Sequence, residues 1–140
     1  MELFDSSIFD LSPIPMWLED YSEIKKQFDV WRSEGINDLA AFLKEDVERV
    51  RSCAHKIKVI RVNPKTLEVF EADSQQDLIK HTANIFQQDM YQTHIQELVA
   101  LWQGETEFFS TAVNYTLTGK RLDIQLRAIV LPGYEHDLSR

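Results

Sequence analysis

The residues of this chain that could carry chemistry are few and scattered. Cys53 is the single cysteine, so no internal disulfide can form, and we interpret it as a buried structural thiol, because a free cysteine commonly packs as a small apolar side chain. His94 and Glu97 lie one helical turn apart and could share a metal ion. Zinc needs further protein ligands, and the sequence offers none in pattern, so the spacing predicts no metal site.

The carboxylates are numerous but follow no catalytic signature. Glu19-Asp20, Glu45-Asp46, Glu105 and Glu107 are predicted to be solvated surface charges. The sequence has no nucleophile elbow, glycine-rich phosphate loop or HExxH helix, and its four glycines leave little for a phosphate cradle. We therefore predict a module without catalysis of its own.

Size and charge narrow the class of protein. A chain of 140 residues, 44% of them hydrophobic, is expected to form one globular domain over residues 1–140. The net charge of −8 argues against nucleic-acid and anionic-membrane surfaces, because both require clustered Lys and Arg. The first ten residues do not resemble a signal peptide, and no apolar run is long enough to cross a bilayer. Together with the single thiol, these features favour the cytoplasm.

The first half of the chain is predicted to be mainly helical. Apolar residues at helical spacing indicate a lead-in helix over 1–11, and a short strand should follow over Ile14–Leu18. Tyr21–Glu34 is expected to form a helix capped by Ser22. A continuous apolar stripe predicts a second helix from Asp38 to about Lys56.

The second half begins with a strand that turns straight into a helix. β-Branched residues predict a strand over Ile57–Val62. Asn63 is a good N-cap and Pro64 suits the first helical turn, so a short helix should follow with Leu67 and Phe70 on one face.

Two more helices are expected before a final hairpin. The first opens at Ser74, and the second runs from about Gln88 to Gln103. Alternation then predicts two strands joined at Thr118-Gly119-Lys120. The expected shared faces are Phe109, Thr111, Val113, Tyr115 and Leu117 in the first strand, and Leu122, Ile124, Leu126, Ala128 and Val130 in the second.

The order of these elements resembles that of a PAS sensory domain, an antiparallel sheet with helices on one face. The resemblance covers about residues 12–140. It rests on Ser12–Trp17 as the first strand, Val62-Asn63 with Leu67 and Phe70, Ser74–Ile79 as the next helix, and Leu117–Asp123 as the hairpin turn. More narrowly, Pro15–Ser22, Val50–Ala54 and Leu131–Glu135 are similar to bacterial PAS modules with a two-helix insert between the first two strands, here residues 22–56. Such modules are N-terminal input units of sensor histidine kinases and GGDEF diguanylate cyclases.

The chain departs from that pattern in two places. The glycine that commonly follows the motif phenylalanine is replaced by Glu71-Ala72. The family pattern also continues into a last strand that lies between the first strand and the hairpin, and this strand is missing after Arg140. We therefore expect these residues to be a fragment of a longer protein.

The resemblance also bears on cofactors. Light-sensing relatives bond a flavin through a cysteine in a helix after the second strand, whereas Cys53 precedes that strand and lacks the motif. His81 and His94 lie in the region where haem-binding relatives place the axial histidine, but neither has a distinctive motif. Neither flavin nor haem is therefore expected.

An apolar pocket between the helices and the sheet is the candidate ligand site, and a filled core is the alternative. Its polar group would be Tyr115 or Asn114. The predicted lining residues are Trp17, Phe70, Phe86, Phe109, Val113 and Tyr115.

The resemblance implies a cytoplasmic sensory module that binds a small ligand or a partner and biases a C-terminal output domain. Apolar residues in Glu2–Leu11 are expected to support a homodimer. A dimerisation module without a ligand is the main alternative. A more remote one is a cone-shaped isomerase-like enzyme with an Asp or His base.

Overall fold

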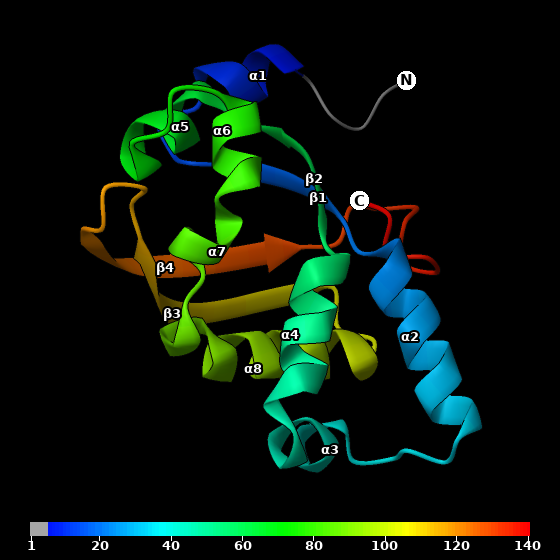
Figure 1. Cartoon of the computed structure of the whole chain (residues 1–140). Helices are drawn as coiled ribbons and strands as arrows, with labels where there is room; N and C mark the ends of the chain where they lie inside the picture. The colour runs from blue at the N-terminus through cyan, green and yellow to red at the C-terminus, as the bar shows by residue number, and fades with distance from the viewer. Residues whose placement is uncertain (1–5) are drawn as a thin grey trace.

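The structure is a computed structural model that describes residues 6–140, and it is an α+β arrangement (Figure 1). Its first part consists of two strands separated by three helices. In chain order, after α1 (Ser6–Leu11), these elements are β1 (Trp17–Asp20), α2 (Ser22–Ser33), α3 (Leu39–Glu45), α4 (Val47–Lys56) and β2 (Lys58–Val62). The predicted lead-in over residues 1–5 lies outside the described residues.

The second part is a run of short helices, one longer helix and a hairpin. The elements are α5 (Pro64–Phe70), α6 (Gln75–Lys80), α7 (Thr82–Ile85), the 3-10 helix η1 (Gln88–Met90), α8 (Tyr91–Trp102), β3 (Glu107–Tyr115) and β4 (Arg121–Ile129). The predicted helix over 88–103 is therefore η1 followed by α8.

The strands form two separate antiparallel ladders. In one, β1 pairs with β2, with Trp17 opposite Val62. In the other, β3 pairs with β4, with Glu107 opposite Ile129. Within residues 6–140 no ladder joins β1 to β4, so the α+β class is confirmed with two two-stranded antiparallel sheets.

The predicted junction between β2 and α5 is confirmed. The Asn63 side chain accepts a hydrogen bond from the Thr66 N–H at 3.0 Å, and Pro64 occupies the first turn. Asp38 caps α3 as expected, accepting from the Ala41 N–H. The prediction for Ser22 is wrong: it is the first helical residue, and its N–H donates to the Asp20 carboxylate.

Two predicted elements have different bounds for local chemical reasons. The helix expected over 38–56 is broken at Asp46, which is extended (φ −149°, ψ 108°) and caps α4 by accepting from the Glu48 N–H. Aspartate favours such N-cap positions, because its short side chain accepts hydrogen bonds from nearby backbone N–H groups. The first strand begins at Trp17 rather than Ile14, since Pro13 and Pro15 cannot donate to a ladder.

The face assigned to the first hairpin strand is also wrong. Phe109 is 65% exposed, whereas Ala112, Asn114 and Thr116 are buried. Residues directly opposite in an antiparallel pair share a face, and Asn114 lies opposite Leu122. The inward face of β4 was predicted correctly, and its pairing forces the even-numbered residues of β3 inward as well.

Most of the buried apolar residues form two clusters. The first joins α2, α3, α4 and α8 and contains Ile24, Phe28, Trp31, Leu39, Leu43, Val50, Cys53, Ile95 and Leu98. The second lies beneath the β1–β2 ladder and contains Val62, Phe70, Leu78 and Ile85, with Trp17 and Phe86 packed against it. Neither cluster fills the space between the two ladders, where a pocket remains.

Candidate functional site

A pocket of about 190 Å³ lies between the two ladders, and we call it the inter-ladder pocket. One wall is β1 with the residues beside it, and the opposite wall is the end of β4 with the start of β3. Part of α8 closes a further side. Its lining includes Leu18, Glu19, Tyr21, Glu97, Val130 and Arg140.

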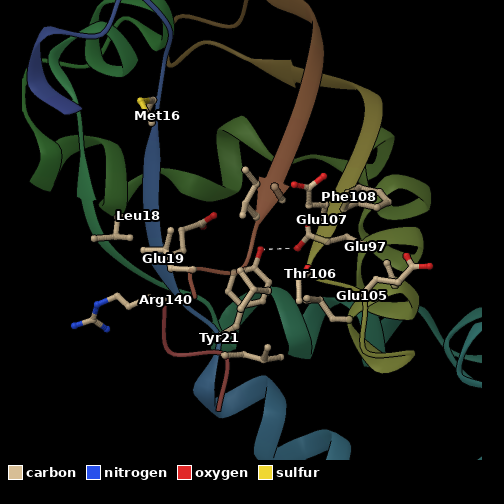
Figure 2. A pocket seen from close by; sticks show the side chains of 17 residues that line it. Met16, Leu18, Glu19, Tyr21, Glu97, Glu105, Thr106, Glu107, Phe108 and Arg140 are labelled. Carbon is tan, nitrogen blue, oxygen red and sulfur yellow. Dashed lines mark hydrogen bonds between the residues drawn. The ribbon is translucent and has the colours of Figure 1, made fainter. Parts of the chain in front are cut away.

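Three polar side chains converge in this mostly apolar space. Glu19 projects from β1 and Tyr21 follows the same strand, while Glu97 comes from α8 (Figure 2). The Tyr21 hydroxyl donates a hydrogen bond to Glu97 Oε1 at 2.6 Å. Glu19 lies within β1, and Tyr21 is the first residue after it.

Burial controls the ionisation of this group. Part of the Glu19 side chain still meets solvent, but its carboxyl group is enclosed by protein, and desolvation followed by the charge of Glu97 raises its pKa from 4.5 to about 8. Desolvation also raises the pKa of Glu97, against the effect of the hydrogen bond from Tyr21. The pKa of the Tyr21 hydroxyl is raised well above its usual value by the same desolvation. At neutral pH burial therefore favours the protonated form of Glu19.

The arrangement can hold a proton or bind a positively charged group. Within residues 6–140 neither Glu19 nor Glu97 forms an ion pair. In the same part of the chain, no three His, Cys, Asp or Glu side chains are grouped so that they could hold a metal ion.

The predicted pocket residues divide into two groups, and none of them lines the inter-ladder pocket. Trp17, Phe70 and Phe86 do meet: the Trp17 ring centroid lies 5.5 Å from that of Phe70 and 5.7 Å from that of Phe86. This is a packed aromatic cluster.

The other predicted residues lie on the hairpin. Phe109, Val113 and Tyr115 occupy the outer face of β3, and the Tyr115 hydroxyl donates to the Asp89 carboxylate. Asn114 is buried on the inner face, where its side-chain amide donates to the Val113 carbonyl at 3.0 Å.

The candidate histidines and the cysteine lie in separate parts of the fold. His81 Nδ1 lies 2.9 Å from the Asp77 carbonyl oxygen, at the end of α6. His94 is buried, its Nε2 has no hydrogen-bond partner among residues 6–140, and desolvation lowers its pKa to about 4. Cys53 is buried in the first cluster, as predicted, and burial raises its pKa to about 11.

The burial of Glu19 and Glu97 was not predicted, although two signals were present in the sequence. Glu19 follows Trp17 at strand spacing in the short strand β1, and Glu97 lies among the buried residues of α8, one residue before Leu98. A charged residue in an apolar stripe indicates a buried polar group. Treating Glu19-Asp20 as one surface pair obscured this, because adjacent strand residues face opposite ways.

The C-terminal residues lie at one end of the pocket. The Leu138 carbonyl accepts from the Tyr21 N–H at 2.8 Å, just after β1. The Arg140 carbonyl accepts from the Leu131 N–H at 3.4 Å, just after β4. Figure 1 shows this terminal segment, in red, beside the start of α2.

Comparison with protein-family models, with curated proteins and with solved structures finds no match to this chain. No helix in residues 6–140 is both long and apolar enough to span a lipid bilayer.

Proposed function

We propose that this chain is a PAS-type sensory module in the cytoplasm. It binds a small ligand or a partner and, without catalysis of its own, biases a C-terminal output domain such as a histidine kinase or a diguanylate cyclase. The bias is a shift between two arrangements of a dimer. The observation that carries the proposal is the inter-ladder pocket, a mostly apolar space with convergent polar groups between the two ladders and α8.

The proposal includes one further strand that lies between β1 and β4 and joins the two ladders into one antiparallel sheet. Both facing edges lack a ladder partner within residues 6–140, and unpaired edges readily accept another strand. The inward apolar side chains of β4 support this reading, because Leu122, Ile124 and Leu126 remain only half-buried.

The terminal segment supports the same placement. The Leu138 carbonyl accepts a hydrogen bond beside β1 and the Arg140 carbonyl accepts one beside β4, so the end of the described chain reaches both walls of the gap between the ladders.

A dimerisation module without a ligand is the second candidate. It is favoured by exposed apolar side chains on and beside α1: Ile8 is 70% exposed, Leu11 82% and Ile14 66%. Phe9, in contrast, is buried, so α1 is anchored by one side while its other side presents an apolar stripe. Such a stripe suits a symmetric contact with a second copy.

Native mass spectrometry of the purified chain tests both candidates. A sensory module should carry a discrete small-molecule mass that is lost on denaturation. A dimer with no added mass would favour the second candidate, and a bare monomer would contradict both. Leu11→Ser is the matched variant for the dimer: it should weaken association and leave any bound small molecule in place, because Leu11 does not line the inter-ladder pocket.

A further inference from the structure

We propose that the inter-ladder pocket binds a small organic cation, an ammonium group carried on an apolar body. Glu97 makes the ionic contact, and Tyr21 is the residue that positions Glu97. The inference rests on the proposed function, because it names the class of ligand for the pocket that the sensory module uses. Three features of the pocket carry it: the burial and bonding of Glu97, the sign of the charges in the lining, and the volume and polarity of the cavity.

The Glu97 carboxyl group is buried at the pocket with one of its oxygens unused. Glu97 belongs to α8, lines the pocket and is only 8% exposed. Its Oε1 accepts the hydrogen bond from the Tyr21 hydroxyl at 2.6 Å. Within residues 6–140 Glu97 forms no other hydrogen bond and no ion pair. A buried carboxylate is costly unless its charge is compensated, so Oε2 is the acceptor that a positively charged donor in the pocket would use.

The charged side chains of the lining favour a cation over an anion. Arg140 is the one basic residue among residues 6–140 that lines the pocket. Its Nη1 donates to the Ser139 carbonyl at 2.6 Å, and Figure 2 shows its guanidinium pointing away from Glu97. A cavity lined mainly by one sign of charge attracts the opposite sign. The acidic residues of the lining are Glu19, Glu97, Glu105 and Glu107.

Glu97 is the acidic residue best placed for the ionic contact. Desolvation raises the pKa of Glu97, and the hydrogen bond from Tyr21 lowers it. An ammonium group at Oε2 would lower this pKa further, so cation binding and ionisation of Glu97 favour each other. Glu107 already has a counter-ion, since its carboxylate lies 3.4 Å from the Arg127 guanidinium.

The remaining lining suits an apolar body of about one ring. Leu18 from β1, Leu101 from α8 and Val130 just after β4 give the cavity apolar walls. Apolar cavities of about 150 Å³ hold one benzene ring, so the 190 Å³ here has room for a ring with a short aminoalkyl chain. A metal ion fits less well, because no three His, Cys, Asp or Glu side chains are grouped to hold one in the described part of the chain.

The test is an NMR titration of the full chain at pH 7 with 2-phenylethylamine and with 2-phenylethanol. The two probes have the same carbon skeleton, but only the amine is charged at this pH. The amine should shift the backbone amides of Leu101, Val130 and Leu131, which line the pocket. It should bind at least about tenfold more tightly than the alcohol, because a charge-assisted hydrogen bond to a buried carboxylate replaces a neutral one. Phenylacetate, which has the opposite charge, should not bind.

The Glu97→Gln variant assigns the charge preference to one residue. It keeps the shape of the side chain and removes its charge, so the affinity for the amine should fall about tenfold while that for the alcohol stays within twofold. Glu34→Gln, the same chemical change at an exposed position outside the pocket, should bind both probes as the wild type does. In the wild type, a nuclear Overhauser effect should join the aminomethylene protons of the amine to the Tyr21 ring. This contact places the ammonium group even if Glu97→Gln fails to fold.

Three results would overturn the proposal: no amide shift with either probe, equal affinity for the amine and the alcohol, or an unchanged preference in Glu97→Gln. Equal affinity would still leave a pocket that binds small molecules, so the sensory proposal would stand while the cation assignment fails. Conversely, a bare monomer in native mass spectrometry would contradict the sensory proposal. The amine titration would then still decide whether the pocket is a cation site.

Discussion

Replacing Asn63 tests how the N-terminal segment is tied to the core. Asn63 is fully buried. Its side-chain oxygen accepts from the N–H groups of Met16 and Thr66, each at 3.0 Å, and its amide donates to the carbonyls of Phe9 at 3.1 Å and Ile14 at 2.8 Å. One side chain therefore caps α5 and holds the backbone on both sides of the α1–β1 connection.

We expect Asn63→Ala to lower the free energy of unfolding by about 3 kcal/mol. Loss of the N-cap costs ~1 kcal/mol, and each of the two carbonyl bonds contributes ~1 kcal/mol when its partner is left buried. Met16 keeps one acceptor, because its N–H also lies 2.9 Å from the Thr66 hydroxyl. No further loss is therefore assigned to it.

Urea denaturation at pH 7, followed by circular dichroism, measures this change. Asp38→Ala is the matched control, since Asp38 caps α3 in the same way but is exposed and holds no distant segment. It should cost ~1 kcal/mol. Hydrogen exchange should show faster exchange of α1 in Asn63→Ala and no such change in Asp38→Ala.

An equal loss in the free energy of unfolding in the two variants would refute this prediction. Unchanged hydrogen exchange of α1 in Asn63→Ala would refute it as well. Either result would mean that the bonds from Asn63 to Phe9 and Ile14 contribute nothing beyond the cap.

Three further predictions follow from how exposed or buried individual side chains are. Phe109→Ser should lower the free energy of unfolding by less than ~1 kcal/mol in the same urea assay, because Phe109 is 65% exposed and contacts the Arg127 guanidinium from the outer face. A loss of ~3 kcal/mol or more would mean that Phe109 is buried, as the sequence predicted. Cys53, buried and with its pKa raised to about 11, should resist iodoacetamide at pH 8 until urea unfolds the chain, and labelling of the folded chain at the rate of a free thiol would contradict this. Glu19 should make stability depend on pH: its pKa is raised from 4.5 to about 8, so the folded chain holds this proton more tightly than the unfolded chain. This stabilisation is fully present below about pH 4.5 and is lost as the pH rises through 8. The loss in the free energy of unfolding is at most ~5 kcal/mol, at about 1.4 kcal/mol per pKa unit. Urea curves at pH 5 and pH 8.5 should differ for the wild type and converge for Glu19→Gln, and parallel behaviour of the two proteins would count against the linkage.

Local sequence determined the elements whose signals act over a few residues. Asn63-Pro64 specified the start of α5, because an N-cap and a fixed proline φ need no distant partner. The alternation of Leu122, Ile124 and Leu126 specified the inward face of β4. At Asp46 the prediction of one continuous helix failed. The apolar stripe continues past this residue, but its side chain caps α4 and breaks the helix.

Tertiary structure decided what depends on partners far along the chain. The face of β3 follows from its register with β4, since its own apolar residues are distributed over both faces. The pairing of Glu19 with Glu97, 78 positions later in the sequence, needs the fold to bring β1 beside α8, and burial then shifts their ionisation. Residue type alone does not reveal their shifted ionisation, because desolvation is a property of the surroundings and not of the residue type.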